Sequence, residues 1–504
     1  MGFKAGCAAV FAAFLITGPA AAQDVTLAAR EGGIVLTGTL QGFDGEFYRI
    51  ETTYGMLTVD AQGVICEGPA CPDMIAPKAV IRLSGAPDAG ASLLPDLFRA
   101  FAERRGLVFE PAQGPGFAAM IRDPTTDKTL AEISFVPEAP DVAMASLAAG
   151  RAELVVASRA QKPFGTRSLA LDALVPVMAP DNPTPEISTA DLARALAGEV
   201  DNWAEVGGPD MPIVLHALTP DSDLQRALVD RLGAPIAADV LHPNMVELSA
   251  AVAEDPWALA ITGRAEVGAA KLLPLTDSCG FPLLPTPLAV KAEDYPLAMP
   301  IFLLTPPRRL PLMAREFLEF LSTPAAQQVI SDAGYVDRSA ARQPMTADGL
   351  RLINAIQGAG EDITLGDLKR LVNLMDGADR LSLTFRFEDG SSTLDAQSQD
   401  NLADLARLIA TGQFKGERLV LAGFSDGSGA AAANLALSVE RAARVAQELS
   451  AVAPDLRPEM LPQVEGFGEA LPMACDETPA GRHLNRRVEL WVLPDFTGSP
   501  PPEN

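Results

Sequence analysis

The chain of 504 residues is poor in histidine and in basic side chains. Its three histidines, His216, His242 and His483, are scattered, whereas a zinc site needs several nitrogen or sulfur ligands at short spacings. Lysine and arginine number 39 against 65 aspartate and glutamate, which gives a formal net charge of −26. That charge repels nucleic acid and anionic membrane surfaces. We therefore expect no metal, no cofactor and no nucleic-acid partner.

Long apolar runs are missing beyond the N-terminus. Lys4 precedes an apolar run at 7–16 that is too short to cross a bilayer, and the small residues Ala20-Ala-Ala22 follow. This pattern predicts a signal peptide at 1–22 with cleavage after Ala22. A retained membrane anchor is the alternative. No later segment is long and apolar enough for a membrane span, so we expect a mature protein in the periplasm.

Cysteines are few, and four of the five follow the predicted signal peptide. Cys66 and Cys71 enclose a short loop with glycine and proline, which suits a local bridge. That pairing would leave Cys279 for Cys475. Four cysteines allow three connectivities, but an exported protein meets an oxidising compartment, where an even count suits disulfides.

Strand and helix signals divide the chain into several regions. Short β-rich runs separated by turn residues fill the segment before residue 78, and strands alternate with helices from there to about 340. The alternation predicts an α/β domain with mainly parallel strands. The expected regions are a signal peptide (1–22), a small β domain (23–77), an α/β domain (78–340), a helical linker (341–378), a C-terminal domain (379–495) and a disordered tail (496–504).

The C-terminal domain contains motifs at fixed offsets. A buried strand at 419–422 runs into Gly423-Phe-Ser-Asp-Gly-Ser-Gly429, and a long helix follows. The later members are Asn434, Leu437-Ser438, Arg441-Ala442 and Asn485-Arg-Arg-Val-Glu489. In these offsets the region resembles the OmpA-like peptidoglycan-binding domain, with Phe424 where histidine is common. The resemblance implies a βαβαβ sandwich.

The same resemblance implies a clamp for a diaminopimelate stem peptide, which carries both an amine and a carboxylate. Asp426 would accept hydrogen bonds from the ammonium group, and Arg441 would hold the carboxylate in a planar fork. Asn434 and Arg487 would give supporting contacts. A competing interpretation is a serine hydrolase, because Gly423 to Gly427 fits the G-x-S-x-G pattern around Ser425. No glycine-rich oxyanion segment precedes it, so we expect no catalytic residues.

Several segments of the region 78–340 share a second pattern. They are Ile81-Arg-Leu-Ser-Gly85, Leu154-Val-Val-Ala-Ser-Arg159, Gly198-Glu-Val-Asp-Asn-Trp-Ala-Glu-Val-Gly-Gly208 and a helix at 315–328. In these segments the region resembles the periplasmic solute-binding proteins of phosphate-type ABC transporters. The resemblance implies two α/β lobes that close on a ligand by hinge motion. It also implies an oxyanion site at the ends of two strands, formed by Ser84, Gly85, Ser158 and Arg159.

One loop departs from that pattern, because Asp221 and Asp223 stand where a hydroxyl-rich turn is expected, and both would repel a phosphate. The sequence predicts a periplasmic protein, associated with the cell wall and outer membrane, that binds peptidoglycan and carries a phosphate-binding-protein-like domain for phosphate or another small anion. Two alternatives stay open. One is the substrate-binding component of a phosphate-type ABC transporter, and the other is a structural envelope protein with a non-functional cleft.

Overall fold

The computed structural model describes residues 25–29, 33–43, 47–68, 70–71, 78–114, 116–345, 351, 353, 355–356, 363–388 and 391–494. The predicted signal peptide and the predicted tail at 496–504 lie outside these residues. The chain divides into two compact units between Ala79 and Val80.

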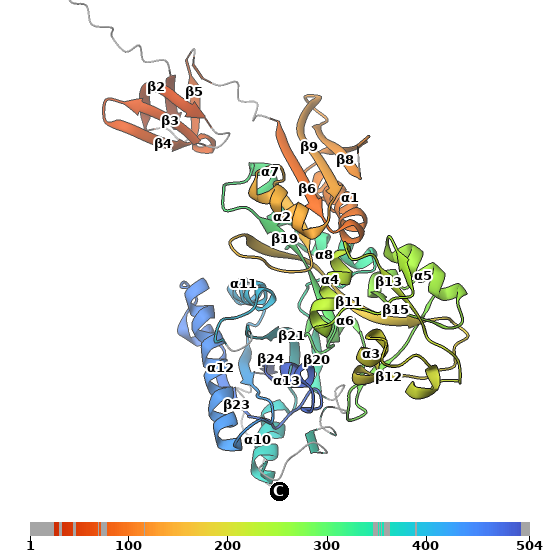
Figure 1. Cartoon of the computed structure of the whole chain (residues 1–504). Helices are drawn as coiled ribbons and strands as arrows, with labels where there is room; N and C mark the ends of the chain where they lie inside the picture. The colour runs from red at the N-terminus through yellow and green to blue at the C-terminus, as the bar shows by residue number, and fades with distance from the viewer. Residues whose placement is uncertain are drawn as a thin grey trace, which may run out of the picture. The chain divides into compact units, whose positions relative to one another are not determined.

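The N-terminal unit is a five-stranded antiparallel sheet with the strand order β4-β3-β2-β1-β5 (Figure 1). Its strands are β1 (Val25–Ala29), β2 (Val35–Phe43), β3 (Phe47–Thr52), β4 (Gly55–Asp60) and β5 (Val64–Glu67). Leu27, Tyr48 and Ile50 are fully buried and form its core. The predicted disulfide between Cys66 and Cys71 is present and closes the end of β5.

The first lobe of the middle domain packs helices against one part of an 11-stranded sheet. Its elements are β6 (Ala79–Gly85), α1 (Pro87–Arg104), β7 (Val108–Ala112), β8 (Phe117–Asp123), β9 (Lys128–Pro137), α2 (Pro140–Ala148), β10 (Leu154–Ala157), α7 (Leu312–Phe320) and α8 (Pro324–Asp332). In α1, Leu93, Leu94, Leu97, Phe98 and Phe101 are buried at helical spacing, as the sequence predicts.

The second lobe occupies the other part of this sheet and adds a separate sheet of three short strands. Its elements are β12 (Ile187–Ser188), α3 (Thr189–Leu196), β13 (Val214–Leu218), α4 (Asp223–Leu232), β14 (Val240–His242), α5 (Met245–Glu254), β15 (Ala258–Gly263), β16 (Lys271–Leu272), β17 (Leu275–Thr276), β18 (Pro282–Leu283) and α6 (Pro287–Lys291). Ser222 caps α4, because its side chain accepts a hydrogen bond from the backbone N–H of Gln225. Trp203 is fully buried in the core of this lobe.

Two long strands join the lobes. β11 (Gly165–Met178) pairs with β19 (Ala298–Thr305) along its first part and with β15 along its second part. The sheet is mixed, which corrects the expectation of mainly parallel strands. β6 and β10 are parallel, whereas β7, β8 and β9 form an antiparallel meander (Figure 1). Short connections join antiparallel strands, and parallel pairing needs a longer crossover.

The C-terminal domain has a five-stranded sheet with the order β20-β21-β24-β22-β23. Its elements are β20 (Arg342–Pro344), α10 (Leu365–Met375), β21 (Asp379–Phe385), α11 (Ala396–Ala410), β22 (Glu417–Gly423), α12 (Ala431–Val452), β23 (Gln463–Gly466), α13 (Pro479–Asn485) and β24 (Val488–Pro494). Leu405 and Val445 place α11 and α12 against one face, and Leu371 places α10 against the core of the other face.

The expected helical linker at 341–378 is in part a component of this domain. β20 pairs with β21, with Arg342 opposite Leu381, and so forms an edge of the sheet. Leu371 and Met375 of α10 are fully buried beside Trp491. The pairing of β20 with β21 and the buried face of α10 therefore attach these parts of the segment to the C-terminal core.

The middle and C-terminal domains are joined covalently. The predicted disulfide between Cys279 and Cys475 is present, and it links the second lobe to the segment before α13. Buried ion pairs add to this connection, including Arg380 with Asp294 at 2.5 Å. No helix among the described residues is both long enough and apolar enough to cross a membrane.

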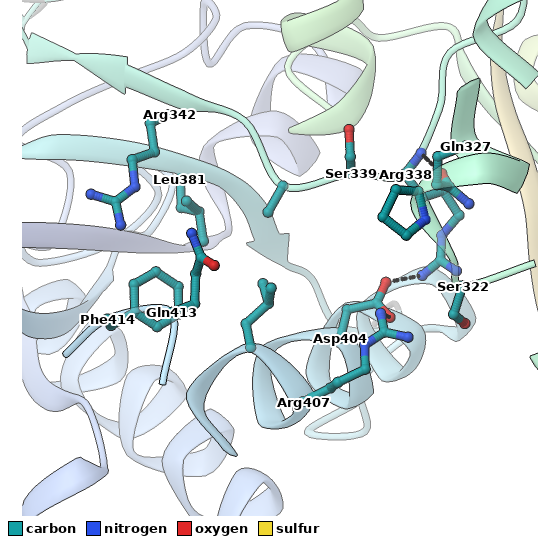
Figure 2. Close-up of a pocket in the computed structure, with 13 residues that line it drawn as sticks. Ser322, Gln327, Arg338, Ser339, Arg342, Leu381, Asp404, Arg407, Gln413 and Phe414 are labelled. Atoms are coloured by element: carbon teal, nitrogen blue, oxygen red, sulfur yellow. Dashed lines mark hydrogen bonds and ion pairs between the residues drawn. The ribbon is translucent and has the colours of Figure 1, made fainter. Parts of the chain in front are cut away.

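A hollow of about 290 Å³ lies where these two domains meet, and three arginines line it (Figure 2). Figure 2 shows Arg338 directed toward Asp404, and their nitrogen and oxygen atoms are 2.7 Å apart. Arg407 also pairs with Asp404, and Arg342 pairs with Glu417 at 2.6 Å. Each guanidinium therefore has a carboxylate partner, and the hollow is part of the domain interface rather than an anion site.

Candidate functional site

The best-supported candidate site lies at the end of β22, where the strand contacts α12. A Cβ atom at Gly423 would lie 1.9 Å from the backbone oxygen of Ser438 on α12, so only glycine permits this close approach. This contact places the loop after β22 beside the part of α12 around Ser438. The loop that carries Asp426 is therefore a neighbour of the helix turn that carries Arg441, and no ion pair joins these two side chains among the described residues.

Asp426 lies in this loop with its carboxylate held from two sides. One oxygen accepts a hydrogen bond from the backbone N–H of Ser428 at 3.1 Å. The other accepts one from Nη1 of Arg486 at 3.0 Å. The Asp426 side chain is 14% exposed and the Arg486 side chain 30%, so solvent reaches both.

Arg441 approaches the same loop from α12. Its Nη1 donates to the backbone oxygen of Phe424 at 3.4 Å. Burial lowers the pKa of Arg441, the nearby Arg486 lowers it further, and Asp426 raises it. In the described part of the chain, no carboxylate lies within ion-pair distance of Arg441. Other carboxylates flank the same loop, because a Cβ atom at Gly427 would lie 2.6 Å from Asp476 and 3.2 Å from Glu469. The Arg441 fork forms an ion pair with none of them in the described part of the chain.

Arg487 is not available to a ligand, which corrects its expected supporting role. Its side chain has no exposed surface, its Nε lies 2.7 Å from Glu489, and its guanidinium lies over the Phe424 ring at 4.4 Å. Burial alone would raise the pKa of Glu489, but Arg351, Arg380 and Arg487 hold it well below its usual range. This buried cluster supports the site from beneath.

The neighbouring Arg486 is the residue that the sequence interpretation missed. The motif at 485–489 contains both arginines, and both precede β24. Strand alternation does not separate them, because residues of both parities are buried along β24. Arg487 enters the core, whereas Arg486 points to Asp426.

Two further side chains shape the loop. Asn434 is 5% exposed, and its Nδ2 donates to Glu469 at 3.3 Å, so it supports the site without being open to solvent. Asp476, which follows Cys475, accepts hydrogen bonds from the backbone N–H of Gly427 at 2.6 Å and from Nδ2 of Asn485 at 2.7 Å. These bonds tie the loop to the segment that carries the interdomain disulfide.

Ser425 does not have the geometry of a nucleophile. It is 4% exposed, and its Oγ has no hydrogen-bond partner among the described residues. A serine nucleophile needs a neighbouring base within hydrogen-bond reach and access for the substrate. The G-x-S-x-G pattern is therefore explained by the sharp turn after β22. Among all the residues that the structure describes, no group of three or more His, Cys, Asp or Glu side chains could hold a metal ion.

The second predicted site lies between the lobes of the middle domain. β6 and β10 are parallel neighbours, so Ser84, Gly85 and Ser158 lie at the same edge of the sheet. A Cβ at Gly85 would lie 2.1 Å from the backbone oxygen of Val156, which accounts for the glycine. Arg159 does not join them. It pairs with Asp230 on α4 with its side chain 60% exposed, which corrects its expected place in the site.

Carboxylates surround the small cavity at this edge. Its volume is about 30 Å³, and Asp88, Asp172 and Asp223 line it together with apolar side chains such as Met245 and Met299. Burial raises the pKa of all three, that of Asp172 to about 7. The cavity has room for about one or two water molecules. Its lining side chains carry negative charge where an external anion would need positive charge.

Comparison with known proteins identifies two families in the chain. Residues 386–486 match the OmpA family, and residues 91–324 match a PBP superfamily domain. Outer membrane porin F of Pseudomonas fluorescens is 36% identical over 113 residues, which are 22% of this chain and 33% of that protein. The chain thus spans about a third of the length of this curated relative.

Solved structures are similar over the middle of the chain. An ABC-type phosphate transport receptor from Vibrio cholerae is 20% identical, with a TM-score of 0.40, over 51% of this chain and 99% of that one. A putative phosphate ABC transporter substrate-binding protein with bound phosphate, from Clostridium perfringens, is 16% identical, with a TM-score of 0.41, over 51% and 99%. Two parts of one polypeptide thus match two different family models, a PBP superfamily domain at 91–324 and the OmpA family at 386–486.

Proposed function

We propose that this chain is a cell-envelope protein that attaches non-covalently to peptidoglycan through Asp426 and Arg441. The observation that carries the proposal is the donor fork of Arg441, which lies beside Asp426 and has no carboxylate partner in the described part of the chain. A diaminopimelate stem carries an ammonium group and a carboxylate close together. Such a ligand suits a site in which Asp426 lies close to the guanidinium groups of Arg441 and Arg486.

In the proposed complex, the stem carboxylate lies in the fork of Arg441. The stem ammonium shares the Asp426 carboxylate with Arg486, which already binds one of its oxygens. The match of residues 386–486 to the OmpA family supports this assignment. The two disulfides suit an oxidising compartment, so we propose a periplasmic location, at the cell wall and near the outer membrane.

For the middle domain we favour a structural role over transport of phosphate. Asp88, Asp172 and Asp223 line its small cavity, and Arg159 is engaged by Asp230 outside it. A phosphate would meet acids there and no compensating cation among the side chains that line the cavity. We propose that the protein binds without catalysing a reaction, and that its C-terminal domain holds the middle domain at the wall.

Co-sedimentation with purified peptidoglycan sacculi tests the attachment. Arg441→Ala should lower the bound fraction by about tenfold or more, because it removes a charged, partly buried contact. Arg444→Ala is the matched control, since Arg444 lies one turn away on α12 and pairs with Glu448 instead. Free diaminopimelate should displace the unmodified protein. Equal retention of Arg441→Ala and the unmodified protein would sink the proposal.

A further inference from the structure

The two lobes of the middle domain are connected across the cleft by a carboxylate. Asp223, the first residue of α4 in the second lobe, accepts a hydrogen bond from the backbone N–H of Ser158 in the first lobe. The donor and acceptor atoms are 2.6 Å apart. Burial raises the pKa of Asp223, and hydrogen bonding by Ser158 partly offsets this. The bond therefore spans the gap in which a solute would lie.

α4 contacts the first lobe at two further points along its length. Arg226 pairs with Asp141 at the start of α2, with 2.7 Å between nitrogen and oxygen. Arg159, one residue after Ser158, pairs with Asp230. Three contacts at successive turns of one helix hold the lobes together, and all three are made by the protein's own side chains.

The groups around Asp223 are those that an oxyanion would use. Ser158 is 7% exposed and lines the cavity, and its Oγ makes no hydrogen bond among the described residues. Ser84, at the end of the neighbouring strand, has a buried Oγ in the same state. The donor that the structure shows at this place is the backbone N–H of Ser158, and the anion that it binds is Asp223.

We propose that Asp223 is a built-in anion: its carboxylate takes the position at the end of β10 that a free carboxylate or oxyanion would otherwise occupy, and so keeps the lobes closed without a solute. An external anion is excluded by the filled space and by Asp88 and Asp172. Removal of the carboxylate alone leaves a vacant site for a small carboxylate such as formate. This inference does not depend on attachment to the wall.

Chemical rescue tests the proposal on the full-length chain. Asp223→Ala removes one carboxylate group, and formate has that group's size and charge. At about pH 6 the neighbouring Asp172 is largely protonated and repels formate less. We expect Asp223→Ala to lower the melting temperature by about 5 °C, because a charged buried acceptor is lost. Formate, compared with chloride at equal ionic strength, should restore at least half of that loss.

Two controls make the result specific. Asp223→Asn keeps the side-chain volume, so formate should leave its melting temperature unchanged, and the unmodified protein should not respond either. Hydrogen exchange of peptides around Ser158 and α4 should be faster in Asp223→Ala and should slow again with formate. The proposal is overturned if formate has no effect on Asp223→Ala, if it stabilises all three proteins equally, or if the unmodified protein is stabilised by phosphate.

Discussion

Asp426 and Asp223 illustrate how one residue type has opposite roles in two regions of this chain. Each is an aspartate whose carboxylate accepts a backbone N–H where a strand and a helix meet. Around Asp426 the neighbouring charges include the guanidinium groups of Arg441 and Arg486. Around Asp223 the cavity is lined by two more acids and is nearly filled.

The difference shows what decides whether an acid at a strand end belongs to an open site. At Asp426 the carboxylate is partly exposed, and the neighbouring Arg441 forms no ion pair among the described residues. Such a pair can bind a ligand that carries both a positive and a negative group. A carboxylate that satisfies the donors of the opposite lobe is itself the ligand. Three experiments distinguish the C-terminal domain around Asp426 from the cleft around Asp223. Each should affect one of these two regions or the disulfide that connects their domains.

The largest effect is expected from breaking the connection. The Cys279–Cys475 disulfide closes a segment with a sequence separation of 196, whereas Cys66–Cys71 has a separation of 5. In the chain-entropy model, loss of the long bridge costs about 5 kcal/mol and loss of the short one about 2 kcal/mol. Denaturation of Cys279→Ser/Cys475→Ser against Cys66→Ser/Cys71→Ser measures the contrast. Equal destabilisation would show that the long bridge adds little to the domain interface.

A smaller effect, confined to the C-terminal domain, is expected from Glu489→Gln. The change leaves Arg351, Arg380 and Arg487 without their shared buried carboxylate. Removing one partner of a buried ion pair destabilises by about 4 kcal/mol. Hydrogen exchange should increase in β22 and β24 and stay unchanged in β10. Faster exchange in β10 as well would mean that the two regions unfold together.

The third effect acts on the cleft and depends on pH. Burial raises the pKa of Asp172 to about 7, so the folded protein keeps a proton that the unfolded chain releases near pH 4. The stability that protonated Asp172 contributes is complete below about pH 4 and is lost as the pH rises through about 7. Asp172→Asn should match the unmodified protein near pH 4 and exceed its stability by about 4 kcal/mol near pH 8, because a shift of about three pKa units is worth about 1.4 kcal/mol per unit.

Urea denaturation at several pH values measures this difference. The residual pH dependence of the variant should reflect Asp88 and Asp223, whose pKa values burial also raises. Sedimentation with sacculi should be the same for both proteins, because Asp172 is not in the C-terminal domain. Parallel stability curves for the two proteins would contradict the buried, protonated state of Asp172.

Much of the fold follows from the sequence, because strand ends, glycines and apolar spacing are local signals. Gly423 and Gly85 mark close approaches, and the helix face of Leu93 to Phe101 is buried as its spacing predicts. Both disulfides were predictable from a short loop and an even count. The placement of Asp426 and Arg441 at the same loop followed from their offset within one motif.

The sequence could not show which way a side chain points or which residues of other elements lie next to it. Arg486 and Arg487 are adjacent, and only the strand's orientation decides which one faces Asp426 and which one enters the core. Arg159 has the right place in the sequence, but its partner Asp230 lies on a helix of the other lobe. Residues 342–344 become a sheet edge through a register with β21 that no local pattern encodes.

The cross-link at Cys475 has a mechanical consequence for the proposed attachment. Asp476, the next residue, holds Gly427 in the loop that carries Asp426. Tension applied by the cell wall at that loop would pass through Asp476 to a covalent S–S bond and from there into the second lobe. The second lobe would therefore take up part of the load through the disulfide, in parallel with the main chain that joins the two domains.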